Sequence, residues 1–265
     1  HTAAPGQWRR HLEDSLRLLR TDYIDIYNHH GINWKRFTEN LDPDKGGLTK
    51  EMLAAKEEGL IRHAAFSFHG PPEDLKKLAD TGYYENAILQ YNLLDQANAE
   101  AIHYLAEKGM GVVVMGPVGG GRLGIASEAI RELTGGAATD TVEAALRFVW
   151  AHPGVNVALS GMESVAMLEK NVRIAQNTEP FTEEQTAALI SLVEQRKKKS
   201  GLYCTGCNYC GPVCPSGVSI PQQLELLNQV WIFGLRDTAG QRYNTPWIVK
   251  VKATECIACG KCVEK

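Results

Sequence analysis

The first 203 residues contain no cysteine, so all seven cysteines of this 265-residue chain lie in its last quarter. No signal peptide opens the sequence, and no apolar run approaches the length of a membrane span. Disulfides need an oxidising compartment, and nothing in the sequence suggests export, so we expect a reducing, cytoplasmic location. A net charge of −3 gives no electrostatic case for nucleic acid or an anionic membrane as a partner.

The sequence also has no G-x-G-x-x-G fingerprint at the start of a helix, which argues against a doubly wound dinucleotide-binding sheet. Short β-branched runs alternate with helical patterns instead, as is typical of βα units around a parallel sheet. We expect strands at 23–27, 63–67, 87–90, 112–115 and 155–159. An eight-unit barrel takes about 250 residues. The α/β fold predicted is therefore a partial (β/α)8 TIM barrel of about five units, with the first three missing.

Helical periodicity and end signals place the helices of this region. The expected helices cover residues 6–19, 48–58, a stretch after Pro71, 96–108, 140–151, 164–175 and 182–198. In the first, Trp8, Leu12, Leu16 and Leu19 share one face. Gly59 is positioned to end the second helix, and Thr182 with Gln185 forms a capping box for the last one.

Seven cysteines form two runs with the spacing of a bacterial two-cluster ferredoxin. They are Cys204, Cys207, Cys210 and Cys214, followed by Pro215, and then Cys256, Cys259 and Cys262. The chain stops one residue before the position of an eighth cysteine, and both of its ends look cut. Structural zinc sites usually use cysteine pairs separated by a longer gap, and disulfides need an oxidising compartment.

Two 4Fe–4S clusters are therefore expected. By the ligation pattern of such ferredoxins, Cys204, Cys207 and Cys210 hold one cluster with the missing cysteine. The other cluster takes Cys214 and the last three cysteines. A single cluster with a vestigial second run, or clusters with a purely structural role, remain alternatives. Between the runs we expect a helix starting near Ser219, with Leu224, Leu227, Trp231 and Leu235 on one apolar face.

Five spaced motifs at strand ends are Leu16 to Leu19 with Thr21 to Tyr27 and His30, Gly59 to Arg62 with Phe66 and Ser67, Gln90 to Asn92, Pro117 to Gly124, and Gly161 with Leu168 to Asn171. Together they resemble the aldo-keto reductase family. With the cysteine runs, the chain is similar to the subgroup that carries a C-terminal 4Fe–4S dicluster domain. The resemblance implies reduction of a small carbonyl or related substrate with NADPH or NADH.

The resemblance also assigns candidate site residues. His30 is the catalytic histidine of the family's Tyr–Lys–Asp–His tetrad, while the other three members belong to the first three units. Ser67 and Gln90 would contact the nicotinamide carboxamide, and Gly116, Pro117 and Val118 would line the cofactor. The alternatives are a histidine that merely ends a strand and polar residues at a solvated barrel mouth. Gly161 and Asn171 would meet the phosphate and adenine ends.

Two positions depart from the family's pattern. Met115 stands where an aromatic residue often stacks on the nicotinamide, and we assign it to the cofactor site. Glu163 stands where a basic residue usually binds the 2′-phosphate. Since a carboxylate repels a phosphate, the choice between NADPH and NADH stays open.

The predicted organisation is a partial barrel over residues 1–180, a linking helix over 181–200 and a dicluster domain over 201–265. The function expected is that of an oxidoreductase whose clusters couple the barrel to a ferredoxin or flavin electron carrier. The alternative is an electron-transfer subunit in which the barrel is a docking scaffold without catalysis. With the first three units missing, this chain alone is expected to be inactive.

Overall fold

The computed structural model describes residues 7–121, 123, 138, 140–177, 179–199, 204 and 210–264. The chain divides into two compact units that are interleaved in the sequence. The first comprises His1–Gly119 and Phe148–Glu169, and the second comprises Gly120–Arg147 and Lys170–Lys265. The domain boundaries expected from the sequence stay a prediction.

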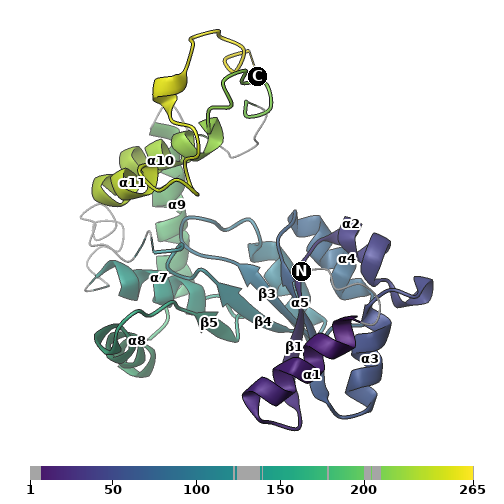
Figure 1. Cartoon of the computed structure of the whole chain (residues 1–265). Helices are drawn as coiled ribbons and strands as arrows, with labels where there is room; N and C mark the ends of the chain where they lie inside the picture. The colour runs from purple at the N-terminus through teal and green to yellow at the C-terminus, as the bar shows by residue number, and fades with distance from the viewer. Residues whose placement is uncertain are drawn as a thin grey trace. The chain divides into compact units, whose positions relative to one another are not determined.

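The first unit is built on a five-stranded parallel sheet with its strands in chain order (Figure 1). The strands are β1 (Ile24–Ile32), β2 (Ile61–Phe68), β3 (Asn86–Gln90), β4 (Gly111–Met115) and β5 (Val157–Leu159). A helix lies between each pair of consecutive strands, which is the arrangement of successive units in a β/α barrel. The sequence prediction of five strands in a partial barrel is confirmed, although β1 runs five residues further than expected.

The helices of this unit also follow the sequence pattern. They are α1 (Gln7–Leu19), the short α2 (Trp34–Arg36), α3 (Thr49–Glu57), α4 (Pro72–Asp80) and α5 (Ala99–Glu107), with short turns at Phe37–Leu41 and Pro43–Lys45. Gly59 adopts a φ of 78°, so it ends α3 as predicted. Leu19 was expected on the buried face of α1, but it is exposed because the helix ends there and Arg20 turns the chain away.

The two faces of the sheet have different surroundings. Tyr27 and His29 of β1 contact Trp8 of α1, and Phe66 of β2 contacts Tyr84, so this face is covered by helices and loops. On the opposite face, side chains of the two edge strands are exposed, including those of Ile26, Val157 and Leu159. The core of the unit therefore lies between the sheet and its outer helices.

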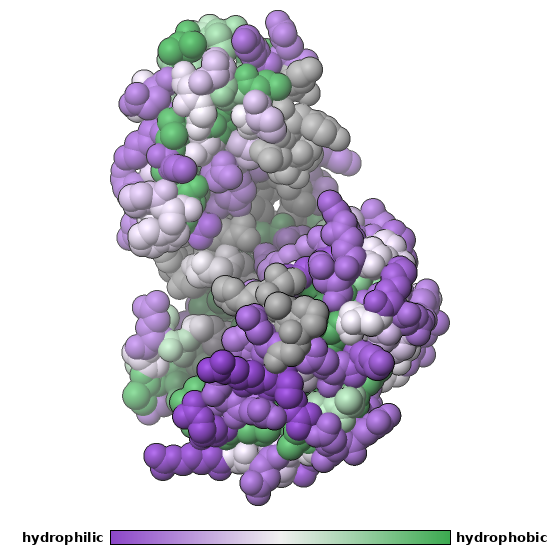
Figure 2. Space-filling model, turned by 45° about the vertical axis from the view of Figure 1, so that its right-hand side comes forward, coloured by the Kyte–Doolittle hydropathy of each residue, from purple (hydrophilic) through white to green (hydrophobic). Residues whose placement is uncertain are grey.

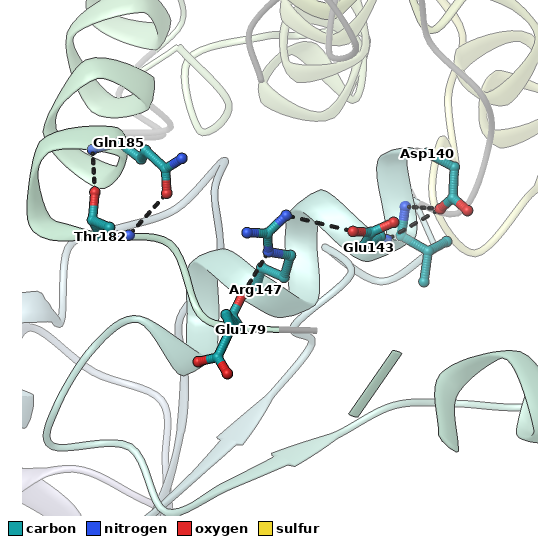
Figure 3. Close-up of polar contacts among 7 residues, drawn as sticks. Asp140, Glu143, Arg147, Glu179, Thr182 and Gln185 are labelled. Carbon is teal, nitrogen blue, oxygen red and sulfur yellow. Dashed lines mark hydrogen bonds and ion pairs between the residues drawn. The ribbon is translucent and has the colours of Figure 1, made fainter. Parts of the chain in front are cut away.

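The second unit is helical and depends on polar contacts at its helix ends. Its helices are the start of α7 (Thr141–Trp150), the end of α8 (Val165–Asn177), α9 (Glu183–Lys199), α10 (Ile220–Phe233) and α11 (Arg236–Tyr243). Figure 3 shows the predicted capping box of α9: the amide of Gln185 donates to Thr182 Oγ1 at 3.2 Å, and the amide of Thr182 donates to Gln185 Oε1 at 3.0 Å. Arg147 lies nearby, with Nε donating to the Glu179 carbonyl at 2.7 Å.

The helix expected between the cysteine runs is present, but Leu235 does not share the apolar face of Leu224, Leu227 and Trp231. Leu226 is 5% exposed and packs with Ala239 and Val249, whereas Trp231 is 46% exposed. Gly234, with a φ of 67°, ends α10 before Leu235, which lies at the start of α11 instead. Helical spacing alone does not tell which of two partly apolar faces meets the core, and α10 has leucines on both.

Within the part of the chain that the structure describes, no helix is long and apolar enough to cross a membrane. Hydrophilic residues cover much of the face shown in Figure 2, and hydrophobic residues are scattered among them.

Candidate functional sites

Three candidate residues from the ends of neighbouring strands share one face of the sheet. Gln90 at the end of β3 pairs with Met115 at the end of β4, so their side chains point the same way. Ser67 of β2 pairs with Ile88, which lies two residues before Gln90 and therefore on the same face. In β/α barrels the carboxyl ends of the strands carry the chemistry. The register thus brings these three positions to that end of the sheet.

His30 lies at an irregularity in β1. The pairing of β1 with β2 shifts between His29 and Ile32, and Gly31 adopts a φ of 63° that side chains rarely permit. Arg36 holds this bend, since its Nη1 donates to the His30 carbonyl at 2.9 Å and to the Gly31 carbonyl at 3.0 Å. Bulges often re-aim a side chain next to an active site.

The side chains around His30 come from the end of β2 and from the residue that follows it. The His30 ring lies edge-on to the His69 ring, with centroids 6.4 Å apart. The Gly31 amide donates to Ser67 Oγ at 2.7 Å, so the buried hydroxyl of Ser67 braces the bend. His30 and Ser67 are therefore brought together. The Ser67 oxygen accepts from the backbone, and its hydroxyl proton can donate to a ligand.

His29 faces away from this site, into the outer core. Its ring lies 6.0 Å from the Trp8 ring and 6.1 Å from the Tyr84 ring, centroid to centroid. Its Nε2 is 3.5 Å from Thr49 Oγ1. Burial, with a smaller contribution from the charge of Arg36, lowers the pKa of His29 to about 4. His29 is a neutral core residue at physiological pH.

The segment after β4 forms a tight turn at Gly116, Pro117 and Val118. Gly116 has a φ of 65°, and its carbonyl accepts from the Gly119 amide at 2.8 Å. The fully buried Asn92 reaches the same carbonyl with Nδ2 at 3.0 Å. Asn92 therefore joins the loop after β3 to the turn after β4. Of the stretch Pro117 to Gly124, residues 122 and 124 lie outside the described residues.

The residues expected at the far end of the cofactor are less tightly placed. Gly161 and Glu163 are both exposed in the segment after β5, and a Cβ added at Gly161 would meet no atom within 4 Å. The half-buried Asn171 lies on the part of α8 that belongs to the second unit. Their contact with a nucleotide stays a prediction.

Four cysteines of the second unit line one cavity of about 600 Å³. They are Cys214, Cys256, Cys259 and Cys262, which are the four assigned to one cluster from their spacing. Leu224 and Leu227 of α10, with Tyr243 of α11, form part of the remaining wall. The apolar face predicted for α10 therefore lines this cavity rather than the core. A mainly apolar cavity with four thiols on its wall fits a cluster that takes thiolate ligands.

The backbone around these thiols is turned toward them. The Val218 amide donates to Cys214 Sγ at 3.4 Å, and the Ala258 amide donates to Cys256 Sγ at the same distance. Ala258 has a φ of 53° and Gly260 a φ of 76°, so the chain bends repeatedly between the last three cysteines. Hydrogen bonds to sulfur are one of the means by which a protein tunes a cluster.

The first cysteine run is described only at its ends. Cys207 lies outside the described residues, whereas Cys204 and Cys210 are both half-buried. Cys204 is held by Asn228 of α10 through its amide and its carbonyl, at 3.1 and 2.8 Å. Among residues 7–264 as far as they are described, no group of three or more His, Cys, Asp or Glu side chains is already close enough to hold a metal ion.

Sequence reasoning did not single out three residues that position these sites. Arg36 and Asn228 act on backbone groups, and Asn92, although part of a quoted motif, was given no role. Asn228 lies 24 residues from Cys204, and a contact at that distance leaves no periodic signal in a single sequence. Arg36 lies only six residues after His30, so of the three contacts this one is close enough in sequence to be sought as a local contact.

Two family models match the chain one after the other. A model of the aldo/keto reductase family matches residues 2–194, and a model of the 4Fe–4S dicluster domain matches residues 196–265. The first match covers more than half of the chain.

Individual relatives match about two thirds of the chain. The chain is 28% identical over 207 residues to the uncharacterized oxidoreductase YqkF of Bacillus subtilis, covering 69% of this chain and 65% of that protein. It is 28% identical to the aldo-keto reductase AKR11C1 of Bacillus halodurans in its holo form, with a TM-score of 0.57 over 69% of this chain and 63% of that one.

A third protein shares the fold at lower identity. It is an aldo/keto reductase of Klebsiella pneumoniae solved in complex with NADP and acetate, with 24% identity and a TM-score of 0.56 over 71% of this chain and 65% of that one. The chain spans less than two thirds of the length of each of these three relatives.

Proposed function

Because this chain belongs to the aldo/keto reductase family, we propose that it is an oxidoreductase that reduces a small carbonyl or related substrate with NADPH or NADH. We propose further that two 4Fe–4S clusters in its second unit link this chemistry to an electron carrier. The observation that carries the proposal is that one chain contains both features: aligned strand ends with the family's motif residues, and four cysteines that line one cavity.

In the first unit, His30 is the proposed catalytic residue. Its position at the bend of β1, braced by Arg36 and Ser67, would keep the imidazole at the carboxyl end of the sheet. There it would orient the substrate carbonyl and share in stabilising charge on its oxygen. The nicotinamide, when bound, supplies the hydride.

The cofactor site would use the ends of β2 to β5. Ser67 and Gln90 offer polar groups to a carboxamide, while Met115 and the turn at Gly116 offer an apolar edge and close backbone approach. Pro117, Val118, Gly161 and Asn171 are proposed to complete the site. The aldo/keto reductase of Klebsiella pneumoniae supports a nicotinamide dinucleotide as the cofactor, since that protein was solved in complex with NADP.

In the second unit, the cysteines would be divided between two clusters. Cys214, Cys256, Cys259 and Cys262 would hold one, because all four line the same cavity. Cys204, Cys207 and Cys210 would hold the other. When bound, the clusters transfer single electrons, so a ferredoxin or a flavin carrier is the proposed redox partner.

The test is to add NADH, and separately NADPH, to the anaerobically reconstituted full-length protein while recording the visible iron–sulfur absorbance. A flavin is then added as a two-electron to one-electron carrier. We expect bleaching by one nucleotide, in the presence or absence of the flavin, and a smaller change in a control variant that lacks one cluster ligand, Cys259→Ser. If dithionite reduces the clusters but neither nucleotide does, coupled reduction is wrong. The barrel is then the docking scaffold of an electron-transfer subunit.

A further inference from the structure

Helix α10 lies between the two cysteine runs in the sequence, and its side chains bind the backbone of Cys204 and of the segment that leads into Cys256. Its side chains Asn228 and Gln223, together with Ser219 before its first residue, bind peptide groups at or near the cysteines. We propose that α10 positions both cluster-binding loops, with Asn228 acting on the first cluster and Gln223 on the second. This inference rests on the proposed two-cluster function.

Asn228 binds both peptide groups of Cys204. The Cys204 amide donates to Asn228 Oδ1 at 3.1 Å, and Asn228 Nδ2 donates to the Cys204 carbonyl at 2.8 Å. Asn228 is only 7% exposed, so leaving its amide without these partners would cost free energy. Two opposed hydrogen bonds fix both the position and the rotation of the Cys204 backbone. The direction of the Cys204 thiol depends on that backbone.

Gln223 and Ser219 act in the same way on the segment that leads into Cys256. Gln223 Nε2 donates to the Val251 carbonyl at 3.2 Å, and the Ala253 amide donates to Gln223 Oε1 at 2.7 Å. Ser219 Oγ accepts from the amides of Lys250 and Val251, each at 3.1 Å. This segment ends in the turn Ala253–Glu255, directly before Cys256.

The helix sets the distance between the two attachment points. Gln223 and Asn228 are five residues apart, which corresponds to about 7.5 Å along a helix axis. Because a helix is rigid over this length, the distance between the two points where the loops attach is set by the helix and not by the loops. Asn228 contacts a ligand residue directly, whereas Gln223 acts three residues before one. We therefore expect the larger effect on the first cluster.

The experiment compares Asn228→Ala and Gln223→Ala with Gln222→Ala, an exposed glutamine on the same helix that serves as the control. Electron paramagnetic resonance and redox titration of the dithionite-reduced protein are the readouts. Cys204→Ser and Cys259→Ser identify which signal belongs to which cluster. Asn228→Ala should shift or remove the signal that Cys204→Ser affects, with a loss of up to about half of the iron. Gln223→Ala should shift the potential of the other signal.

Several outcomes are decisive. If both variants keep the two signals and potentials of the unsubstituted protein, α10 does not position the loops. If each variant changes both clusters equally, the assignment of one residue to one cluster is wrong. Asn228→Asp keeps the shape and the acceptor but loses the donor, so it tests the same point if Asn228→Ala fails to fold. If the unsubstituted protein binds no cluster, the proposed function itself fails, which separates the two claims.

Discussion

His29 and His30 are adjacent residues with opposite surroundings, because successive side chains of a strand point to opposite faces. His29 lies in the outer core against Trp8 and Tyr84, while His30 lies beside His69 at the bend of β1. Of these two histidines, only His30 lies on the face of the sheet that carries the candidate site. The burial of His29 lowers its pKa, and this can be measured through the pH dependence of stability.

Acid should weaken the first unit through His29. Its pKa is about 4 in the folded chain and about 6.5 when unfolded, so between these values only the unfolded chain binds the proton. The contribution of neutral His29 to the free energy of unfolding is fully present above about pH 6.5 and is lost as the pH falls toward 4. We expect a loss of about 2 kcal/mol between pH 7 and pH 5. Urea unfolding at the two pH values measures it.

The matched variant is His29→Gln, which cannot titrate. His152, whose pKa burial also lowers, is present in both proteins, so the difference between them isolates His29. An equal loss of stability in the variant and the unsubstituted protein would contradict the assignment.

Asn92 should be a second sensitive residue. Its Nδ2 donates to Gly116, and its Oδ1 accepts from the amides of Leu94 and Asp95 at 2.9 and 3.0 Å. Removing all three bonds from a buried position in Asn92→Ala should cost about 3 kcal/mol of unfolding free energy. Asn92→Asp keeps the two accepted bonds and should cost less. Urea unfolding ranks the variants, and equal costs would show that the two accepted bonds contribute nothing.

At the scale of the element, helix limits set by local residues were predictable, whereas features that depend on contacts with other elements were not. The limits of α3 and α4 followed from Gly59 and Pro72, whose backbone preferences are local. The extension of β1 through His30 was missed, because it depends on a bend at Gly31 that is braced by Ser67 from another strand. The buried face of α10 was also missed, since a leucine facing a cavity has the same spacing as one facing a core.

The capping box of α9 predicts a local effect. Thr182→Ala removes the hydroxyl that accepts from the Gln185 amide, and such a loss typically costs about 1 kcal/mol. We expect faster hydrogen exchange of the Gln185 amide and of the first turn of α9. Thr182→Ser keeps the acceptor and should leave the exchange rate almost unchanged. Faster exchange in both variants would show that the methyl group, rather than the hydrogen bond, matters.

At the scale of the whole molecule, the two units depend on different sources of stability. The first has an extensive apolar core behind the sheet. In the cysteine-bearing part of the second, residues 210–264 as far as they are described, the buried apolar residues are Val218, Leu226, Leu235, Ala239 and Val249. A small domain with few buried apolar residues commonly needs bound metal to stay folded. The cysteine spacing predicted a separate cluster-binding region, whereas the assignment of residues 120–147 to the second unit had no signal in the sequence.

Removing iron should therefore loosen the second unit selectively. We expect anaerobic chelation to increase hydrogen exchange in residues 210–219 and 251–262, and then in α10 and α11. The amides of β2, β3 and β4 should keep their protection. Exchange mass spectrometry of loaded and stripped protein measures both. Equal loss of protection in the sheet would contradict separate sources of stability.

The central claim is that an aldo/keto reductase-type unit is joined to two 4Fe–4S clusters, one of them held by Cys214 together with the last three cysteines. The most direct measurement is the content of iron, acid-labile sulfide and zinc in the anaerobically purified full-length protein, compared with that of its Cys214→Ser variant. The account predicts about eight irons per chain with equal sulfide, and loss of about half in the variant. Zinc in place of iron, or a variant that keeps all of its iron, would contradict it.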